Sequence, residues 1–134
     1  MRTGPIRCQE VADARDLRVE LAGLHGDTAV VTVAGEIDLR SALTLRDHLL
    51  AVTEAGFTSI VIDFGKVLFC DASGLGALVA LANRLRATGG GVWLAGVRPP
   101  QRRLFQLTGL DRRFPLCERV EDAIAQAGAH SPRR

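Results

Sequence analysis

The chain has 134 residues, a formal net charge of +2, 47% hydrophobic residues and 24% charged residues. This length predicts one domain with a single hydrophobic core, and the composition excludes a disordered chain. No apolar run approaches the roughly 20 residues of a membrane span and no signal peptide opens the chain, so we expect a cytoplasmic protein without a membrane partner.

The first half of the chain predicts a strand hairpin followed by a helix. Residues 1–15 are polar and mixed, whereas 17–23 alternate apolar and polar residues as a half-buried strand does. A His-Gly-Asp turn joins this strand to the β-branched segment 28–35, which predicts an antiparallel hairpin. The leucines that follow recur at helical spacing, with Asp38 as the predicted N-cap and Gly56 as the predicted stop.

The second half alternates between strand and helix patterns. Segment 57–64 is almost continuously apolar, which predicts a strand buried on both faces that ends at Gly65-Lys66. The remaining predicted elements are a helix over 71–88, a strand over 92–97, a helix over 98–109, a short strand over 114–117 and a helix over 120–128.

A hairpin followed by alternating helices and strands predicts an α/β sandwich. Its sheet is expected to be mixed and mostly parallel, with four to five strands and about four helices. The predicted boundaries are a lead-in over 1–15, one domain over 16–127 and a flexible tail over 128–134.

The stretch DASGLG, residues 71–76, lies where the buried strand becomes a helix, at the edge of the sheet where α/β folds place their sites. Asp71 can cap the helix, and Ser73 then lies in a first turn whose free amides and dipole favour a phosphate. Gly74 and Gly76 cost roughly 0.5–1 kcal/mol each in a helix interior, and they allow another backbone to approach the outer face. The structural alternative is a simple cap, an ordinary serine and glycines that permit tight helix–sheet packing.

Three motifs carry a resemblance to a known family. VAGEIDL precedes the first predicted helix, DASGLGALV opens the second, and R-x-L-F-x-L-T-G-L spans Arg102 to Leu110. Together they resemble the STAS-domain family, specifically its stand-alone bacterial anti-sigma-factor antagonists, over residues 16–127. The resemblance implies a STAS-like sandwich without a cofactor, which binds an anti-sigma factor and thereby displaces a sigma factor. That partner is often a GHKL-type serine kinase.

The glycine pair and the resemblance together predict a docking surface for the partner. Its predicted residues are Asp38, Asp71, Ala72, Ser73, Gly74, Leu75 and Gly76. We expect the protein itself to be a monomer or a weak homodimer. The alternative function is a STAS sensory or scaffold subunit of a larger signalling assembly, on which no kinase acts.

The resemblance also implies a phosphorylation switch, from which this chain departs. In the family the kinase phosphorylates a hydroxyl of the D-S-[ST]-G motif, and the added charge of about −1.5 to −2 inactivates the antagonist. The usual acceptor is the first residue after the aspartate, which here is Ala72 and has no oxygen. Either Ser73 is the phospho-acceptor, or the chain binds its partner without this control.

Other functions have less support in the sequence. A-S-G-L-G is not the nucleophile elbow of hydrolases, and neither His25 nor His48 has a recognisable partner for nucleophilic catalysis. There is no P-loop, and no aromatic residues are interleaved with the arginines as nucleic-acid binding would favour. The irregular spacing of Cys8, Cys70 and Cys117 argues against a disulfide framework or a zinc site. Cys70 precedes a helix start, so it is either a thiol of lowered pKa or a small buried residue.

Overall fold

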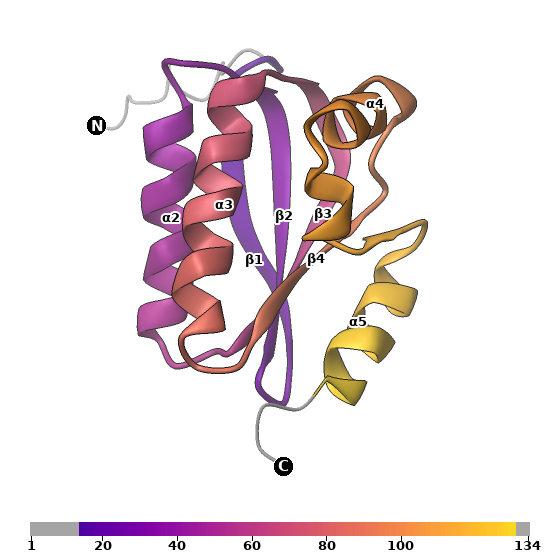
Figure 1. Cartoon of the computed structure of the whole chain (residues 1–134). Helices are drawn as coiled ribbons and strands as arrows, with labels where there is room; N and C mark the ends of the chain where they lie inside the picture. The colour runs from indigo at the N-terminus through magenta and orange to yellow at the C-terminus, as the bar shows by residue number, and fades with distance from the viewer. Residues whose placement is uncertain (1–13, 131–134) are drawn as a thin grey trace, which may run out of the picture.

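The computed structural model describes residues 14–130, and within them five strands form one sheet in the order β1-β2-β3-β4-β5 (Figure 1). Cys8, nearly all of the predicted lead-in over 1–15 and the last residues of the predicted tail over 128–134 lie outside the described residues. The strands are β1 (Arg18–His25), β2 (Thr28–Ile37), β3 (Ser59–Cys70), β4 (Gly91–Ala95) and β5 (Leu116–Cys117).

The predicted α/β sandwich is confirmed. β1 and β2 form the antiparallel hairpin, and the pairs β2–β3, β3–β4 and β4–β5 are parallel. The helices are α2 (Ala42–Glu54), α3 (Ala72–Arg86), α4 (Pro99–Thr108) and α5 (Val120–Ala129), with a 3-10 turn at Leu110–Arg112. Figure 1 shows α2 and α3 side by side across the sheet, α4 near its upper end and α5 beside its lower end.

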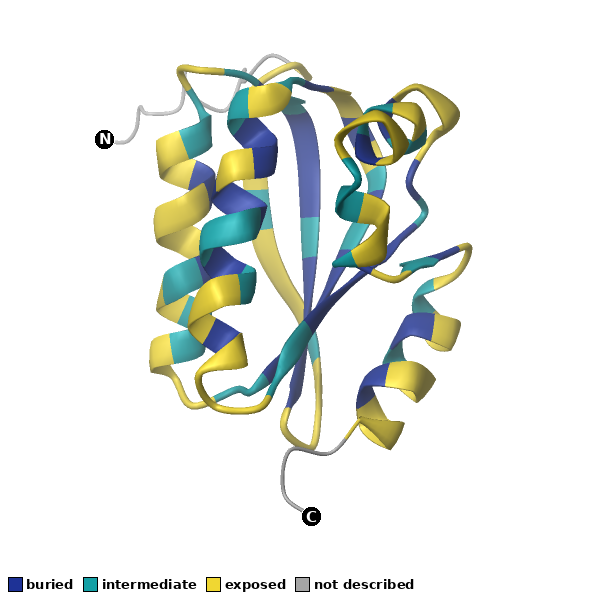
Figure 2. Cartoon of the chain, viewed as in Figure 1, coloured by how far each residue is buried: buried dark blue, intermediate teal, exposed yellow. Residues whose placement is uncertain are grey.

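The sheet is covered on both faces by hydrophobic clusters. Consecutive strand residues point to opposite faces, so Val31 belongs to the larger cluster and Val30 to the smaller one. Side chains of α2, α3 and α4 complete the larger cluster, and Ala123 and Ala127 of α5 pack with Trp93 in the smaller. The buried residues form stripes along the helices and run almost continuously along β2 (Figure 2).

Strand β3 is longer than the sequence pattern predicts. The expectation that it ends at Phe64 is wrong, because the strand continues to Cys70. Gly65 does not break it: the register against β2 shifts here, and the Gly65 N–H donates to Asp63 Oδ1 at 2.9 Å. An irregularity of this kind absorbs extra residues without ending the pairing. The DASGLG motif follows directly after Cys70, so it lies at the carboxyl end of the extended strand.

None of the helices in the described part of the chain combines the length and the apolar character that a membrane span requires.

Candidate functional site

The carboxyl ends of β2 and β3 bring Asp38 and Asp71 to the same edge of the sheet. Ile37 pairs with Cys70, and the Asp71 N–H donates to the Ile37 carbonyl at 3.0 Å. The two aspartates therefore follow directly from paired residues of neighbouring strands. This edge is the place where parallel α/β sheets hold their ligands.

Asp71 has the predicted local role. It is the N-cap of α3, and its Oδ1 accepts a hydrogen bond from the Ser73 N–H at 2.9 Å. One of the free amides of the first turn is satisfied in this way, which stabilises the helix start.

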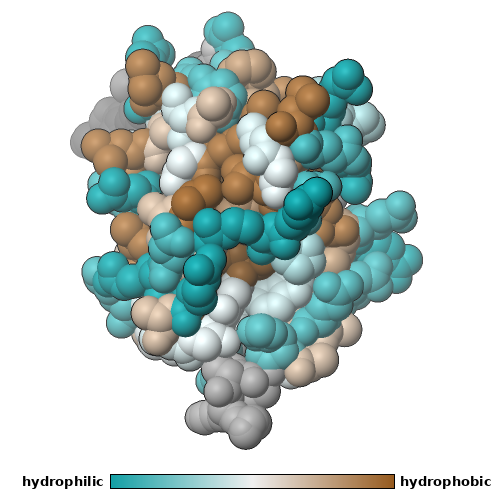
Figure 3. Space-filling model, in the orientation of Figure 1, coloured by the Kyte–Doolittle hydropathy of each residue, from teal (hydrophilic) through white to brown (hydrophobic). Residues whose placement is uncertain are grey.

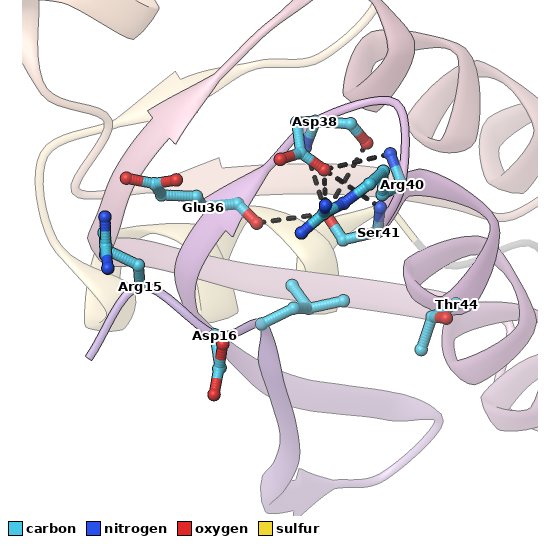
Figure 4. Close-up of a pocket in the computed structure, with 8 residues that line it drawn as sticks. Arg15, Asp16, Glu36, Asp38, Arg40, Ser41 and Thr44 are labelled. Carbon is cyan, nitrogen blue, oxygen red and sulfur yellow. Dashed lines mark hydrogen bonds between the residues drawn. The ribbon is translucent and has the colours of Figure 1, made fainter. Parts of the chain in front are cut away.

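The prediction that Asp38 is the N-cap of α2 is wrong in position. The helix begins at Ala42, and Ser41 is its N-cap residue. Asp38 instead closes the turn that leads into the helix, because its Oδ1 accepts from the N–H groups of Arg40 and Ser41 at 3.0 Å each (Figure 4). In return, Ser41 Oγ accepts from the Asp38 N–H at 3.0 Å. The hydrogen bond from the Ser41 backbone is the main cause that lowers the pKa of the Asp38 carboxyl.

Asp38 also lines a polar pocket beside this turn. The other lining residues are Arg15, Asp16, Leu17, Glu36, Arg40, Ser41 and Thr44 (Figure 4). Charges of both signs line the pocket, and the described residues contain no group of three His, Cys, Asp or Glu side chains that could hold a metal ion. None of the DASGLG residues contributes to it, so Asp38 lies beside that motif but opens onto a different cavity.

The DASGLG residues differ in exposure. Ala72 and Gly76 are exposed, Ser73 is half-buried, and Gly74 and Leu75 are buried. The structure therefore divides the predicted docking residues into surface positions and core positions.

The two glycines of this motif serve different purposes. A Cβ on Gly74 would overlap Ile37 Cγ2 and lie 2.8 Å from Cys70 Sγ. A Cβ on Gly76 would meet no atom within 4 Å. The expectation that both glycines clear the outer face of the helix is therefore wrong for Gly74, which permits close packing of α3 on the sheet. Only Gly76 leaves open surface.

Cys70 is not an activated thiol. The side chain is 7% exposed, and burial together with the negative charge of Asp71 raises the pKa of the thiol to about 12. The alternative of a lowered pKa is therefore wrong, because burial of the thiol disfavours its charged form. Cys70 is a small buried residue of the core.

Ser73 and Gly76 also line a groove between α2 and α3. The other lining residues are Leu39, Ala42, Leu43, Arg46, Ala77 and Ala80. The α2 side of this groove is not among the residues predicted from the sequence, because helical spacing by itself does not separate buried leucines from exposed ones. The signal available in the sequence is helical phase: Leu43 lies about 200° around the helix from the core residue Leu45, and Leu39 precedes the helix.

Comparison with known proteins identifies the domain that this chain contains. Residues 19–123 match the family model described as STAS domain. The chain is 34% identical over 101 residues to the anti-sigma-F factor antagonist RsfB of Mycobacterium tuberculosis, an alignment that covers 75% of this chain and 81% of that protein.

Solved structures show the same fold. The crystal structure of an anti-sigma factor antagonist from Mycobacterium paratuberculosis matches with a TM-score of 0.76 and 31% identity, over 87% of this chain and 98% of that one. The anti-sigma factor antagonist SpoIIAA in its unphosphorylated form matches with a TM-score of 0.73 and 26% identity, over 84% of this chain and 97% of that one. Because one family model spans most of the chain and a relative above 30% identity aligns over most of its own length, this chain belongs to the STAS-domain family.

Proposed function

We propose that this chain is an anti-sigma-factor antagonist, which binds a cognate anti-sigma factor and thereby frees a sigma factor for transcription. The observation that carries the proposal is its alignment with proteins of that name over nearly their whole length, 98% for the mycobacterial structure. A match over almost the whole length of stand-alone antagonists favours the function of an antagonist over that of a scaffold subunit in a larger assembly. The names of these relatives describe regulators, so we propose that the chain acts by binding and not by catalysis.

The docking surface is proposed at the carboxyl edge of β2 and β3 and the first turns of α3. Its contacts come from the accessible positions Ala72, Ser73 and Gly76. Gly74 and Leu75 support these positions from the core, whereas Asp38 and Asp71 hold the two adjoining turns in place. A surface of fixed backbone turns is pre-organised, which reduces the conformational entropy lost on binding.

The experiment that tests this function is a displacement assay. Labelled sigma factor is held in a complex with the purified cognate anti-sigma factor, and the chain is added in increasing amounts. Stoichiometric release of the sigma factor is expected. An unchanged complex at excess chain contradicts the proposal.

We further propose a serine-kinase partner that phosphorylates this chain slowly or not at all. Ala72 occupies the usual acceptor position, and it is exposed, whereas the Ser73 side chain is half-buried. Neighbouring helix positions point about 100° apart, so the Ser73 hydroxyl is turned away from the position of the usual acceptor. A misplacement of about 1 Å can lower a reaction rate by about 100-fold. The antagonist would then remain in its binding-competent state.

Mass spectrometry after incubation with the cognate kinase and ATP tests this proposal. The wild-type chain is expected to gain little phosphate, and Ala72→Ser is expected to gain it efficiently at residue 72. Ser73→Ala is the matched control that removes the remaining hydroxyl of the motif. Rapid, stoichiometric phosphorylation of Ser73 in the wild-type chain would overturn the proposal of a persistent antagonist.

A further inference from the structure

The groove between α2 and α3 exposes hydrophobic side chains that a folded domain normally covers. Leu39, in the turn before α2, is 77% exposed and Leu43 of α2 is 60% exposed, although α2 buries Leu45 and Leu49 completely. Figure 3 shows hydrophobic atoms on the surface over the upper part of α2, at the left of the view. Exposed hydrophobic side chains clustered at a groove mark an interaction surface.

The floor of the groove is open and made of small residues. Ala42 of α2 and Gly76, Ala77 and Ala80 of α3 line it, and above Gly76 there is free space out to 4 Å. Small side chains let the backbone of another element approach closely, so the two leucines form a raised edge beside a shallow floor.

One cation lies in this otherwise uncharged groove. Arg46 is the single charged residue among those that line it. Its side chain is exposed, and it makes no ion pair with any described residue. A hydrophobic groove with one unpaired cation is complementary to a hydrophobic surface that carries one acidic group.

The lining residues follow the periodicity of a helix on both sides. On the α2 side they are Ala42, Leu43 and Arg46 of the helix and Leu39 of the turn before it, and on the α3 side they are Ser73, Gly76, Ala77 and Ala80. The α3 set is spaced by three, four and seven residues, and within α2 Arg46 follows Leu43 by three residues and Ala42 by four, so two neighbouring helices present rows of side chains with a furrow between them. Such a furrow accepts a third helix by packing of ridges into grooves.

We propose that this groove receives an amphipathic helix of the anti-sigma factor, whose hydrophobic face covers Leu39 and Leu43 and whose acidic side chain pairs with Arg46. The inference rests on the proposed function and extends its docking surface from α3 onto α2. Ser73 and Gly76 belong to both surfaces, so the helix lies directly beside the motif.

The test measures the affinity of the purified anti-sigma factor used in the displacement assay, by titration calorimetry. Leu43→Glu and Leu39→Ala are each expected to weaken binding by about 10-fold or more, because they remove buried hydrophobic contact. Arg46→Glu is expected to weaken it by about 100-fold, because attraction becomes repulsion, whereas Arg46→Lys keeps most of the affinity.

Matched controls on other surfaces separate the groove from general effects. Leu24→Glu changes a leucine of similar exposure, 56%, on β1, and Arg86→Glu reverses an exposed charge in the last turn of α3. Both are expected to bind within about 2-fold of the wild type. All the changed positions are exposed, and an unchanged urea midpoint confirms that each variant is folded.

A charge exchange identifies the acidic group. Acidic residues on the helices of the anti-sigma factor are changed one at a time to lysine, and one of them is expected to restore the affinity of Arg46→Glu. Restoration by no single change, with wild-type binding intact, would overturn the proposed pairing.

The remaining outcomes separate this inference from the proposed function. Groove variants that bind like the wild type, beside a tight wild-type complex, would overturn the groove assignment alone. A wild-type chain that neither binds the anti-sigma factor nor releases the sigma factor would overturn both. A chain that dimerises in sedimentation, and that Leu43→Glu makes monomeric without loss of anti-sigma-factor binding, would assign the groove to a second copy and overturn the proposal.

Discussion

At the scale of single residues, the two glycines of the DASGLG motif, Gly74 and Gly76, have different surroundings and therefore different roles. Gly74 faces Ile37 and Cys70 across the interface between α3 and the sheet, and Gly76 faces open space. The first glycine is needed for packing. The second costs helix stability without a packing benefit, which favours a role at the binding surface.

Alanine substitutions separate these two roles. Gly74→Ala is expected to lower the free energy of unfolding by about 1–3 kcal/mol, because its new methyl group overpacks the core. Gly76→Ala is expected to raise it by about 0.5–1 kcal/mol, because alanine is the better helix former and meets no atom. Urea unfolding of both variants checks the opposite signs, and two changes of the same sign would contradict this assignment.

The raised pKa of the Cys70 thiol predicts that the free energy of unfolding depends on pH in the alkaline range. Between its usual value of 9.0 and about 12, the folded chain keeps the thiol proton that the unfolded chain has lost. The unfolded state then binds fewer protons, so the free energy of unfolding falls as the pH rises through this window. Urea unfolding across this range is expected to show a steeper loss for the wild type than for Cys70→Ala, and equal slopes would show that the buried thiol has no such effect.

At the scale of elements, two aspartates organise the helix starts in different ways. Asp71 caps α3 directly, and Asp38 closes a turn before α2 begins. Both hold backbone amides at the same sheet edge, so the local shape of the proposed docking surface depends on them.

Asp71→Ala is expected to lower the free energy of unfolding by about 0.5–2 kcal/mol, because the Ser73 N–H loses its acceptor. Asp71→Asn is the matched control, since an asparagine oxygen can accept the same hydrogen bond and its cost is expected to be small. Urea unfolding compares the two variants. An equal loss in both would mean that the negative charge, and not the cap, stabilises the helix.

The lowered pKa of Asp38 predicts that the free energy of unfolding also depends on pH in the acidic range. Its pKa is lowered in the folded chain, so its contribution to stability is complete above the usual value of 3.8 and is lost as the pH falls through the lowered value. Asp38→Asn is expected to weaken this acid dependence relative to the wild type in urea unfolding. Identical acid profiles would contradict a role for the carboxylate.

At the scale of the whole molecule, the two faces of the sheet carry separate layers. In the larger hydrophobic cluster α2 and α3 pack on one face of the sheet, and in the smaller cluster α5 packs against Trp93 on the other face. His130 adds an edge contact to the indole, with ring centroids 5.3 Å apart. The proposed docking surface belongs to the first layer, so the second layer can be perturbed independently.

Ala127→Glu tests this separation, because it places a charge on the buried face of α5, at a position that is 3% exposed. Trp93 is the single tryptophan, so its fluorescence is expected to shift to the red as α5 loosens. Affinity for the anti-sigma factor is expected to remain unchanged. Gln126→Glu, at the exposed neighbouring position, is the control without a spectral shift, and a large loss of affinity in folded Ala127→Glu would show that the layers are coupled.

Local patterns of residues are enough to predict the kind and order of the elements and to indicate the family to which the chain belongs. Hydrophobic period, turn residues and caps act over a few neighbouring residues, so the hairpin, the Asp71 cap and the alternation of strands and helices could be predicted. The motifs around residues 35–38, 71–76 and 102–110 are equally local, and the resemblance they carried is confirmed by the family match.

Contacts between distant segments determine which of these residues are buried and which are exposed. β3 passes Gly65 because pairing with β2 continues across an irregular register, which is an interaction between distant segments. Gly74 of α3 is buried because Ile37 of β2 lies against it. Burial at the same interface raises the pKa of the Cys70 thiol. Leu39 and Leu43 form the edge of a groove because α3 packs beside α2 and leaves them uncovered. Exposure depends on contacts between segments far apart in the chain, and a pattern of neighbouring residues does not contain them.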